Sequence, residues 1–140
     1  MAPNPGTKPR LEFSGTDEIG TTEQTHEGIG QNSDGELILG QDYDWLCFSV
    51  TNDDSNDLNK FVIQAKVSAS DTFRDFYGTW TANIVGELYT TSNLTVLAAT
   101  SGAGVARVNV KGLYSIRYRM DSDTAASTIL LKGVAIRDVP

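Results

Sequence analysis

The sequence has 140 residues, of which 39% are hydrophobic and 21% charged, and this suits a single globular domain with a core. Its net charge of −7 does not favour nucleic acid as a partner, and no apolar run approaches the ~20 residues of a membrane-spanning helix. The single cysteine, Cys47, excludes an internal disulfide and is expected to be a small buried hydrophobe. The first residues lack the apolar core of a signal peptide, so we expect no secretion.

The charge is unevenly distributed along the chain. Residues 1–57 carry −10 and residues 58–140 carry +3. The acidic half of one copy could therefore meet the basic half of another. The alternative is a solvated surface that is unevenly charged.

Residues 1–32 are predicted to form an extended N-terminal arm. The segment has three prolines, many glycines and threonines, and few large apolar residues, so it cannot bury enough area to offset the entropy of ordering. We expect it to become ordered against a partner surface. Its candidate interface residues are Lys8, Arg10, Leu11 and Phe13.

Residues 33–140 are predicted to form the folded domain, and strand patterns begin early in it. A short apolar run at 36–39 precedes Trp45–Thr51, in which Leu46, Phe48 and Val50 should point inward. An acidic loop at 52–59 leads to Phe61–Ala69, where the alternate residues Phe61, Ile63, Ala65, Val67 and Ala69 should share one buried face. Residues 70–77 fit either a short strand or a turn, and further strands are expected at 79–85, 87–90 and 94–99.

The stretch Val105–Arg137 contains three more strand patterns separated by short breaks. Tyr114, Ile116, Tyr118 and Met120 alternate with polar residues, as do Val108 and Val110. The short breaks predict an antiparallel meander. About seven or eight short strands without any helical period predict an all-β protein, an antiparallel β-sandwich or jelly roll.

No constellation of residues points to catalysis or to a cofactor. His26 is the sole histidine and is expected to be a polar surface residue, which argues against a catalytic triad and a zinc site. The acidic run Asp53–Asp57 lacks the pattern of a calcium loop, so a solvated turn is expected. We therefore expect no enzyme, no cofactor and no metal.

Two groups of side chains have both a binding and a structural interpretation. The aromatic residues could stack on sugars or fill the core; they are Trp45, Tyr77, Trp80 and Tyr89. The basic residues of the last strands should share a wet face, as a patch for acidic partners or as solvated charges; they are Arg107, Lys111, Arg117 and Arg119.

The run from Ala106 to Arg119, followed by a polar hairpin and Thr128–Val134, resembles a pattern of small tailed-phage structural proteins. In these proteins a glycine-leucine step, here Gly112-Leu113, precedes a strand carrying an arginine, a hairpin and a final strand. Residues 45–76 are similar to their first sandwich strands, and the resemblance covers about residues 35–137.

The resemblance implies a decoration or cement protein on the outer surface of a phage capsid, with a β-sandwich or jelly-roll body. It further implies that the major capsid protein is the partner, that the protein self-assembles, more readily as a homotrimer than as a dimer, and that it has no enzymatic activity. Neither nucleic acid nor a membrane is expected as a partner. The alternative function is a carbohydrate-binding module or a phage tail or fibre module, because those share the same strand pattern.

Overall fold

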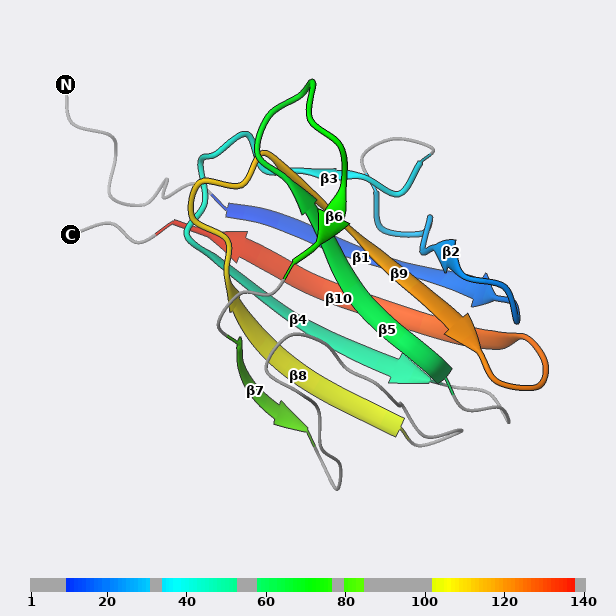
Figure 1. The fold of residues 1–140 in the computed structure, drawn as a ribbon. Coiled ribbons are helices and arrows are strands. Elements are labelled where there is room, and N and C mark those ends of the chain that lie inside the picture. The colour runs from blue at the N-terminus through cyan, green and yellow to red at the C-terminus, as the bar shows by residue number, and fades with distance from the viewer. Residues whose placement is uncertain (1–9, 31–33, 53–57, 77–79, 85–101, 138–140) are drawn as a thin grey trace, which may run out of the picture.

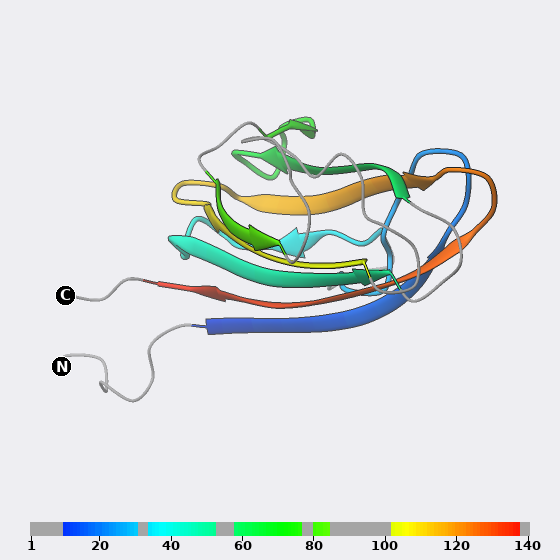
Figure 2. The same cartoon turned by 90° about the horizontal axis from the view of Figure 1, so that it is seen from below.

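The computed structural model describes residues 10–30, 34–52, 58–76, 80–84 and 102–137. These residues form ten strands and no helix, so no described segment is a helix that could cross a bilayer. The strands make two antiparallel sheets that pack face to face (Figures 1 and 2). The predicted all-β sandwich is confirmed.

The first sheet has the strand order β1-β10-β4-β8-β7. Its strands are β1 (Arg10–Ile19), β10 (Ser127–Ile136), β4 (Trp45–Asn52), β8 (Gly102–Asn109) and β7 (Trp80–Ile84). The second sheet has the order β2-β9-β5-β6, and β3 also pairs with β9. Its strands are β2 (Gln24–Thr25), β9 (Ser115–Ser122), β5 (Leu58–Lys66), β6 (Arg74–Asp75) and β3 (Leu37–Ile38).

The core lies between the sheets and follows the alternation in the sequence. In β4 every second residue, from Leu46 to Asn52, is buried, as predicted. In β9 Ile116, Tyr118 and Met120 are fully buried. The Tyr118 ring lies at the centre of an aromatic group whose ring centroids are 5.2 to 6.4 Å away; its members are Phe13, Phe48 and Phe61. Interdigitated rings of this kind contribute both buried area and edge-to-face attraction.

The predicted meander of the last three strands is wrong. Strands β8 and β10 belong to the first sheet, whereas β9 lies between them in the chain but in the second sheet. Residues 110–114 and 123–126 each carry the chain from one sheet to the other (Figure 2). Both sheets bury one face against the same core, so the same period of two appears in long strands of either sheet, such as β4 and β9. The alternation therefore identified the strands but could not assign them to a sheet.

The predicted arm is also wrong for residues 10–30. Strand β1 pairs with β10 along its whole length, from Arg10 opposite Ile136 to Ile19 opposite Ser127. Phe13, Ile19 and Ile29 are buried in the core. An edge strand needs few apolar residues because its neighbour supplies backbone hydrogen bonds and only one face is buried. Lys8 and the rest of residues 1–9 lie outside the described residues.

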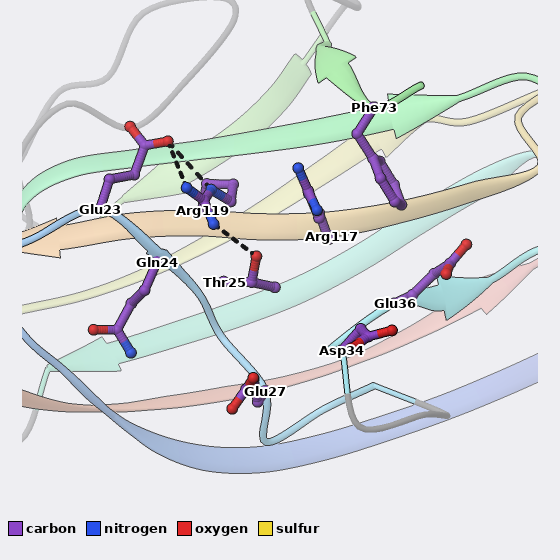
Figure 3. A pocket seen from close by; sticks show the side chains of 9 residues that line it. All are labelled: Glu23, Gln24, Thr25, Glu27, Asp34, Glu36, Phe73, Arg117 and Arg119. Carbon is purple, nitrogen blue, oxygen red and sulfur yellow. Dashed lines mark hydrogen bonds and ion pairs between the residues drawn. The ribbon is translucent and has the colours of Figure 1, made fainter. Parts of the chain in front are cut away.

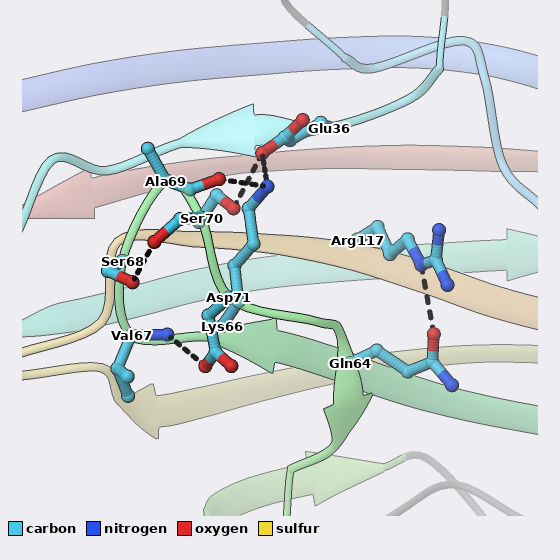
Figure 4. Close-up of polar contacts among 10 residues, drawn as sticks. Glu36, Gln64, Lys66, Val67, Ser68, Ala69, Ser70, Asp71 and Arg117 are labelled. Carbon is cyan, nitrogen blue, oxygen red and sulfur yellow. Dashed lines mark hydrogen bonds and ion pairs between the residues drawn. The ribbon is translucent and has the colours of Figure 1, made fainter.

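Strand β5 ends earlier than predicted. Phe61, Ile63 and Ala65 are buried, but Val67 is 56% exposed and Ala69 is exposed as well. The chain turns after Lys66, and the Val67 amide donates to the Asp71 carboxylate over 3.2 Å (Figure 4). Hydrogen bonds from the amides of Thr72 and Val67 lower the pKa of Asp71. A side-chain acceptor that satisfies the Val67 amide in this way competes with continuation of the strand.

Some of the remaining strand predictions are confirmed, and the others concern residues that the structure does not describe. Residues 70–77 contain the two-residue strand β6, and the strand expected at 79–85 is β7. The acidic run 53–57 and the strands expected at 87–90 and 94–99 lie outside the described residues. Seven described strands have five or more residues, in keeping with the seven or eight expected.

Candidate functional site

The outer face of the second sheet carries a pocket of about 470 Å³, which we call the arginine pocket. It lies over β9, between the segment around β2, the approach to β3, and the turn before β6 (Figure 3). Its charged lining consists of two arginines and four carboxylates; these are Arg117, Arg119, Glu23, Glu27, Asp34 and Glu36. Arg117 and Arg119 project from the same face because they are two residues apart on β9.

Arg119 is held by residues next to β2. Its Nε and Nη2 atoms donate to Glu23 Oε2 over 3.2 and 3.1 Å, and its Nη1 donates to Thr25 Oγ1 over 3.0 Å. Thr25 stands opposite Arg119 in the β2–β9 pairing. The ion pair is partly buried, with side-chain exposures of 24% for Arg119 and 31% for Glu23. The Arg119 guanidinium is therefore held in place as part of the wall of the pocket.

Arg117 is fixed differently. Its Nε donates to Gln64 Oε1 over 2.9 Å (Figure 4). Gln64 Nε2 in turn donates to Asp75 Oδ1 over 3.0 Å. Its guanidinium lies 4.3 Å from the centroid of the Phe73 ring, a cation–π contact. Burial, and then repulsion from Arg119, lowers the pKa of Arg117. Within the described structure, its Nη1 and Nη2 atoms donate no hydrogen bond, and the Arg117 side chain lines the pocket (Figure 3).

Glu36 is neutralised on the other side of the pocket. The Lys66 ammonium lies 3.1 Å from Glu36 Oε1, and the Ser115 hydroxyl donates to the same oxygen over 2.8 Å (Figure 4). Both Lys66 and Glu36 are largely buried, with side-chain exposures of 13% and 15%. The acidic first half of the chain thus meets the basic second half within one molecule, through Glu36–Lys66 and Glu23–Arg119. This gives an intramolecular reason for the uneven charge.

The outer face of the first sheet differs in character. Five apolar or weakly polar side chains lie on it where an outer face is usually polar; we call them the apolar outer face, and they are Trp45, Cys47, Leu130, Val134 and Ile136. Leu130 is 38% exposed and the others are half-buried, and the exposed Lys132 lies between Leu130 and Val134 on the same face of β10. Burial raises the pKa of Cys47, which points to this face and not into the core as expected.

The charged neighbours of this face include two of the predicted interface residues. Arg10 lies opposite Ile136, and Arg107 lies opposite Cys47. The Arg107 guanidinium lies 4.4 Å from the centroid of the Trp45 ring. Trp45, Cys47, Val134 and Ile136 are thus adjacent across β4 and β10, and charged side chains lie beside them. Apolar side chains bordered by charged ones are typical of a protein interface.

The predicted basic patch is not one surface. Arg107 belongs to the first sheet and Arg117 and Arg119 to the second, so they lie on opposite outer faces of the sandwich. Lys111 is exposed in the connection between β8 and β9. The prediction of one basic patch was wrong because it assumed a meander, in which β8 and β9 would be neighbours in one sheet.

Two other predicted interface residues point inward. Phe13 is buried in the core and Leu11 is half-buried against it. Of the aromatics proposed to stack on sugars, Tyr77 and Tyr89 lie outside the described residues, as does the side chain of Trp80. The carboxylates of the pocket were not predicted, because they come from segments that are distant in sequence and share no motif.

His26 is buried and not on the surface as predicted. Its Nε2 donates to the Ile129 carbonyl over 2.8 Å, and its Nδ1 accepts from the Gly28 amide over 3.3 Å. This arrangement satisfies the neutral ring, and burial lowers the pKa of His26. It links the segment after β2 to β10. No group of His, Cys, Asp or Glu in the described parts of the chain is arranged to hold a metal ion.

Comparison with known proteins gives only distant likenesses. No family model matches the sequence, and no curated protein matches it. Among solved structures, the SPBc2 prophage-derived protein YomS is 11% identical with a TM-score of 0.45, covering 86% of this chain and 94% of that chain.

Two further structures are similar at the same level. A chain of the cyanophage Pam1 capsid asymmetric unit is 15% identical with a TM-score of 0.39, covering 99% of this chain and 92% of that chain. A structure of the CBM22-1 and GH10 modules of endo-1,4-beta-D-xylanase 10B from Clostridium thermocellum, complexed with xylohexaose, is 16% identical with a TM-score of 0.40. The match covers 89% of this chain and 26% of that chain. At these identities and TM-scores, none of the three carries an argument about function.

Proposed function

We propose that this chain is a structural virion protein that binds the outer surface of a phage capsid and stabilises the shell without catalysing a reaction. The residues that resemble tailed-phage structural proteins, from Ala106 to Val134, fall on β8, β9 and β10 and so span both sheets. The glycine-leucine step forms the crossing between the sheets: Gly112 has φ of 86° and Leu113 packs against the core. The resembling residues thus have a defined role in the fold.

The observation that carries the proposal is the apolar outer face of the first sheet. A solvated outer face would place polar residues at these positions, whereas here Trp45, Val134 and Ile136 are adjacent across β4 and β10. Apolar area of this kind on a sheet, bordered by Arg10 and Arg107, fits a surface that is covered in an assembly. We assign it to contact with the major capsid protein.

The proposal includes self-association, as a homotrimer. Copies joined in one particle share an effective concentration at the shell, so weak individual contacts add up to stable attachment. The intramolecular pairs Glu23–Arg119 and Glu36–Lys66 leave fewer charges for contacts between copies. Apolar contact, more than charge pairing, should therefore dominate the attachment.

The alternative of sugar binding through exposed aromatic rings has little support in the structure. Of the four aromatic residues that raised it, Trp45 is the one with a described side chain, and the Arg107 guanidinium lies over one face of its ring. A sugar cannot stack on that face of the ring.

The proposal is tested by adding purified protein to phage capsids that lack decoration. Occupancy is measured by co-sedimentation, and shell stability by the temperature at which the capsids release a trapped dye. We expect saturable occupancy and a raised release temperature. No occupancy, or occupancy with an unchanged release temperature, contradicts a cementing role.

A further inference from the structure

We propose that the arginine pocket of the second sheet binds a neutral carbohydrate, through hydrogen bonds from Arg117 and to Glu27. The proposal goes beyond capsid binding. It concerns the outer face opposite the one assigned to the shell, so either proposal can fail while the other holds.

The first step is the state of Arg117. Its Nε is anchored on Gln64 and its plane is fixed over Phe73, so the position of the guanidinium is set before any ligand arrives. Its two terminal nitrogen atoms donate to no described residue. A planar fork with free donors matches two acceptor oxygens side by side, as on neighbouring ring carbons of a sugar.

The second step is the charge of the pocket. Glu23 and Glu36 already face Arg119 and Lys66, and the pocket also places the Arg117 guanidinium and the Glu27 carboxylate in one lining. An anionic ligand would meet the Glu27 carboxylate, and a cationic ligand would meet the donors of Arg117. A hydroxyl group both donates and accepts, so a neutral polyol fits donors and acceptors in one pocket.

The third step is the acceptor. The Glu27 side chain lines the pocket and is exposed, and it makes no hydrogen bond or ion pair with the described residues. Its backbone is nevertheless fixed, because the Glu27 amide donates to Asp17 Oδ2 over 2.8 Å. A volume of about 470 Å³ lies within the roughly 300–1,000 Å³ range of small-molecule sites and suits one or two sugar rings.

The test begins with the full chain on an array of oligosaccharides. The array contains neutral hexose and pentose oligosaccharides beside oligosaccharides with uronic or sialic acid. We expect binding to neutral members. Titration of the labelled protein with a bound oligosaccharide should then shift the NMR signals of residues 23–27, 117 and 119. No binding to neutral members at millimolar concentration, or binding to the acidic members alone, would overturn the proposal.

Variants locate the site. Arg117→Gln should weaken binding by about tenfold or more, since it removes charge-assisted hydrogen bonds. Glu27→Gln tests the acceptor at an exposed position where the fold is not at risk, and should weaken binding severalfold. Arg107→Gln changes the same residue type on the opposite sheet and should leave affinity unchanged. Equal affinity of Arg117→Gln, Glu27→Gln and the unmodified chain would overturn the assignment.

Discussion

Strand β9 and the segment 10–30 are both built into the sandwich, but they are held in different ways. Strand β9 contributes three fully buried side chains within five residues, Ile116, Tyr118 and Met120. The segment 10–30 contributes three buried apolar side chains over 21 residues. It compensates with backbone contacts: β1 pairs with β10 throughout, and the Ser122 amide donates to the Gly20 carbonyl over 2.8 Å.

Close backbone packing distinguishes the segment further. A Cβ atom added at Gly15 would lie 1.9 Å from the Gly28 carbonyl oxygen, so these two glycines are in direct backbone contact. The His26 amide donates to the Tyr118 carbonyl over 2.9 Å, which attaches the segment to β9. A segment poor in apolar residues can therefore be a structural part of the core if its backbone groups are satisfied by neighbouring strands.

The largest expected effect is that of removing residues 1–30. The truncation exposes the edge of β10 and takes Phe13, Ile19 and Ile29 out of the core. We expect the cooperative unfolding transition to be lost, as measured by circular dichroism during urea titration. A truncated protein that still unfolds cooperatively near the original midpoint would show that the segment is an accessory arm.

The second expected effect is at the centre of β9. Tyr118→Ala should lower the free energy of unfolding by about 3–5 kcal/mol, because a large buried ring is lost. Arg117→Ala is the neighbouring control and should cost about 1 kcal/mol, the value of a partly exposed hydrogen bond. Urea denaturation compares the two variants. Similar losses at both positions are incompatible with the alternation in β9.

The third prediction concerns the glycine contact. Gly15→Ala should cost about 3 kcal/mol or more, because the added methyl group meets the backbone of Gly28. Gly112→Ala is the control: nothing lies within 4 Å, but φ is 86°, so backbone strain alone should cost about 1 kcal/mol. The melting temperatures of the two variants separate the effects. A smaller loss at Gly15 than at Gly112 would contradict the close packing of the segment.

The smallest predicted stability effect is the pH dependence from His26. Burial lowers the pKa of His26 in the folded state, so the unfolded chain binds its proton at a higher pH. The contribution of neutral His26 to the free energy of unfolding is therefore complete above the pKa of about 6.5 in the unfolded chain. It is lost as the pH falls towards the lower pKa of the folded state. A charged Nδ1–H would also oppose the Gly28 amide that now donates to it.

The measurement is the free energy of unfolding between pH 7.5 and pH 5, for the unmodified chain and His26→Gln. We expect stability of the unmodified chain to fall towards pH 5 and the variant to show a weaker dependence. Since the chain has one histidine, the difference between the two curves isolates its titration. Parallel curves would mean that His26 is accessible to solvent in the folded protein.

Much of the fold could be predicted because alternation reports directly on burial. The inward residues of β4 and β9 were identified from period two alone, and so was the all-β class. Sheet membership could not be predicted, because β8, β9 and β10 bury one face against the same core and differ only in where the chain crosses. The position of β1 was missed because its stability comes from backbone pairing, which leaves little trace in composition.

The candidate site was predicted less well, for a related reason. Arg117 and Arg119 were identified as outward-facing, which is correct. Their partners Glu23, Gln64 and Phe73 come from three segments that meet only after the two sheets have formed. Arg107 and Arg117 were placed together although they lie on opposite faces. The face of the strand on which a residue lies could be predicted from the alternation, whereas contacts between strands depend on the topology of the sheets.

The central claim, attachment to a capsid through the apolar outer face, is tested most directly by lysine substitutions on the two sheets. Leu130 is 38% exposed on β10 of the first sheet, and Val67 is 56% exposed after β5 of the second. Lysine at either exposed position should leave the fold intact, as checked by circular dichroism. Occupancy of undecorated capsids by co-sedimentation is then compared for Leu130→Lys and Val67→Lys. The account predicts that occupancy falls by about tenfold or more with Leu130→Lys and is unchanged with Val67→Lys; full occupancy with Leu130→Lys, or an equal loss with Val67→Lys, would contradict it.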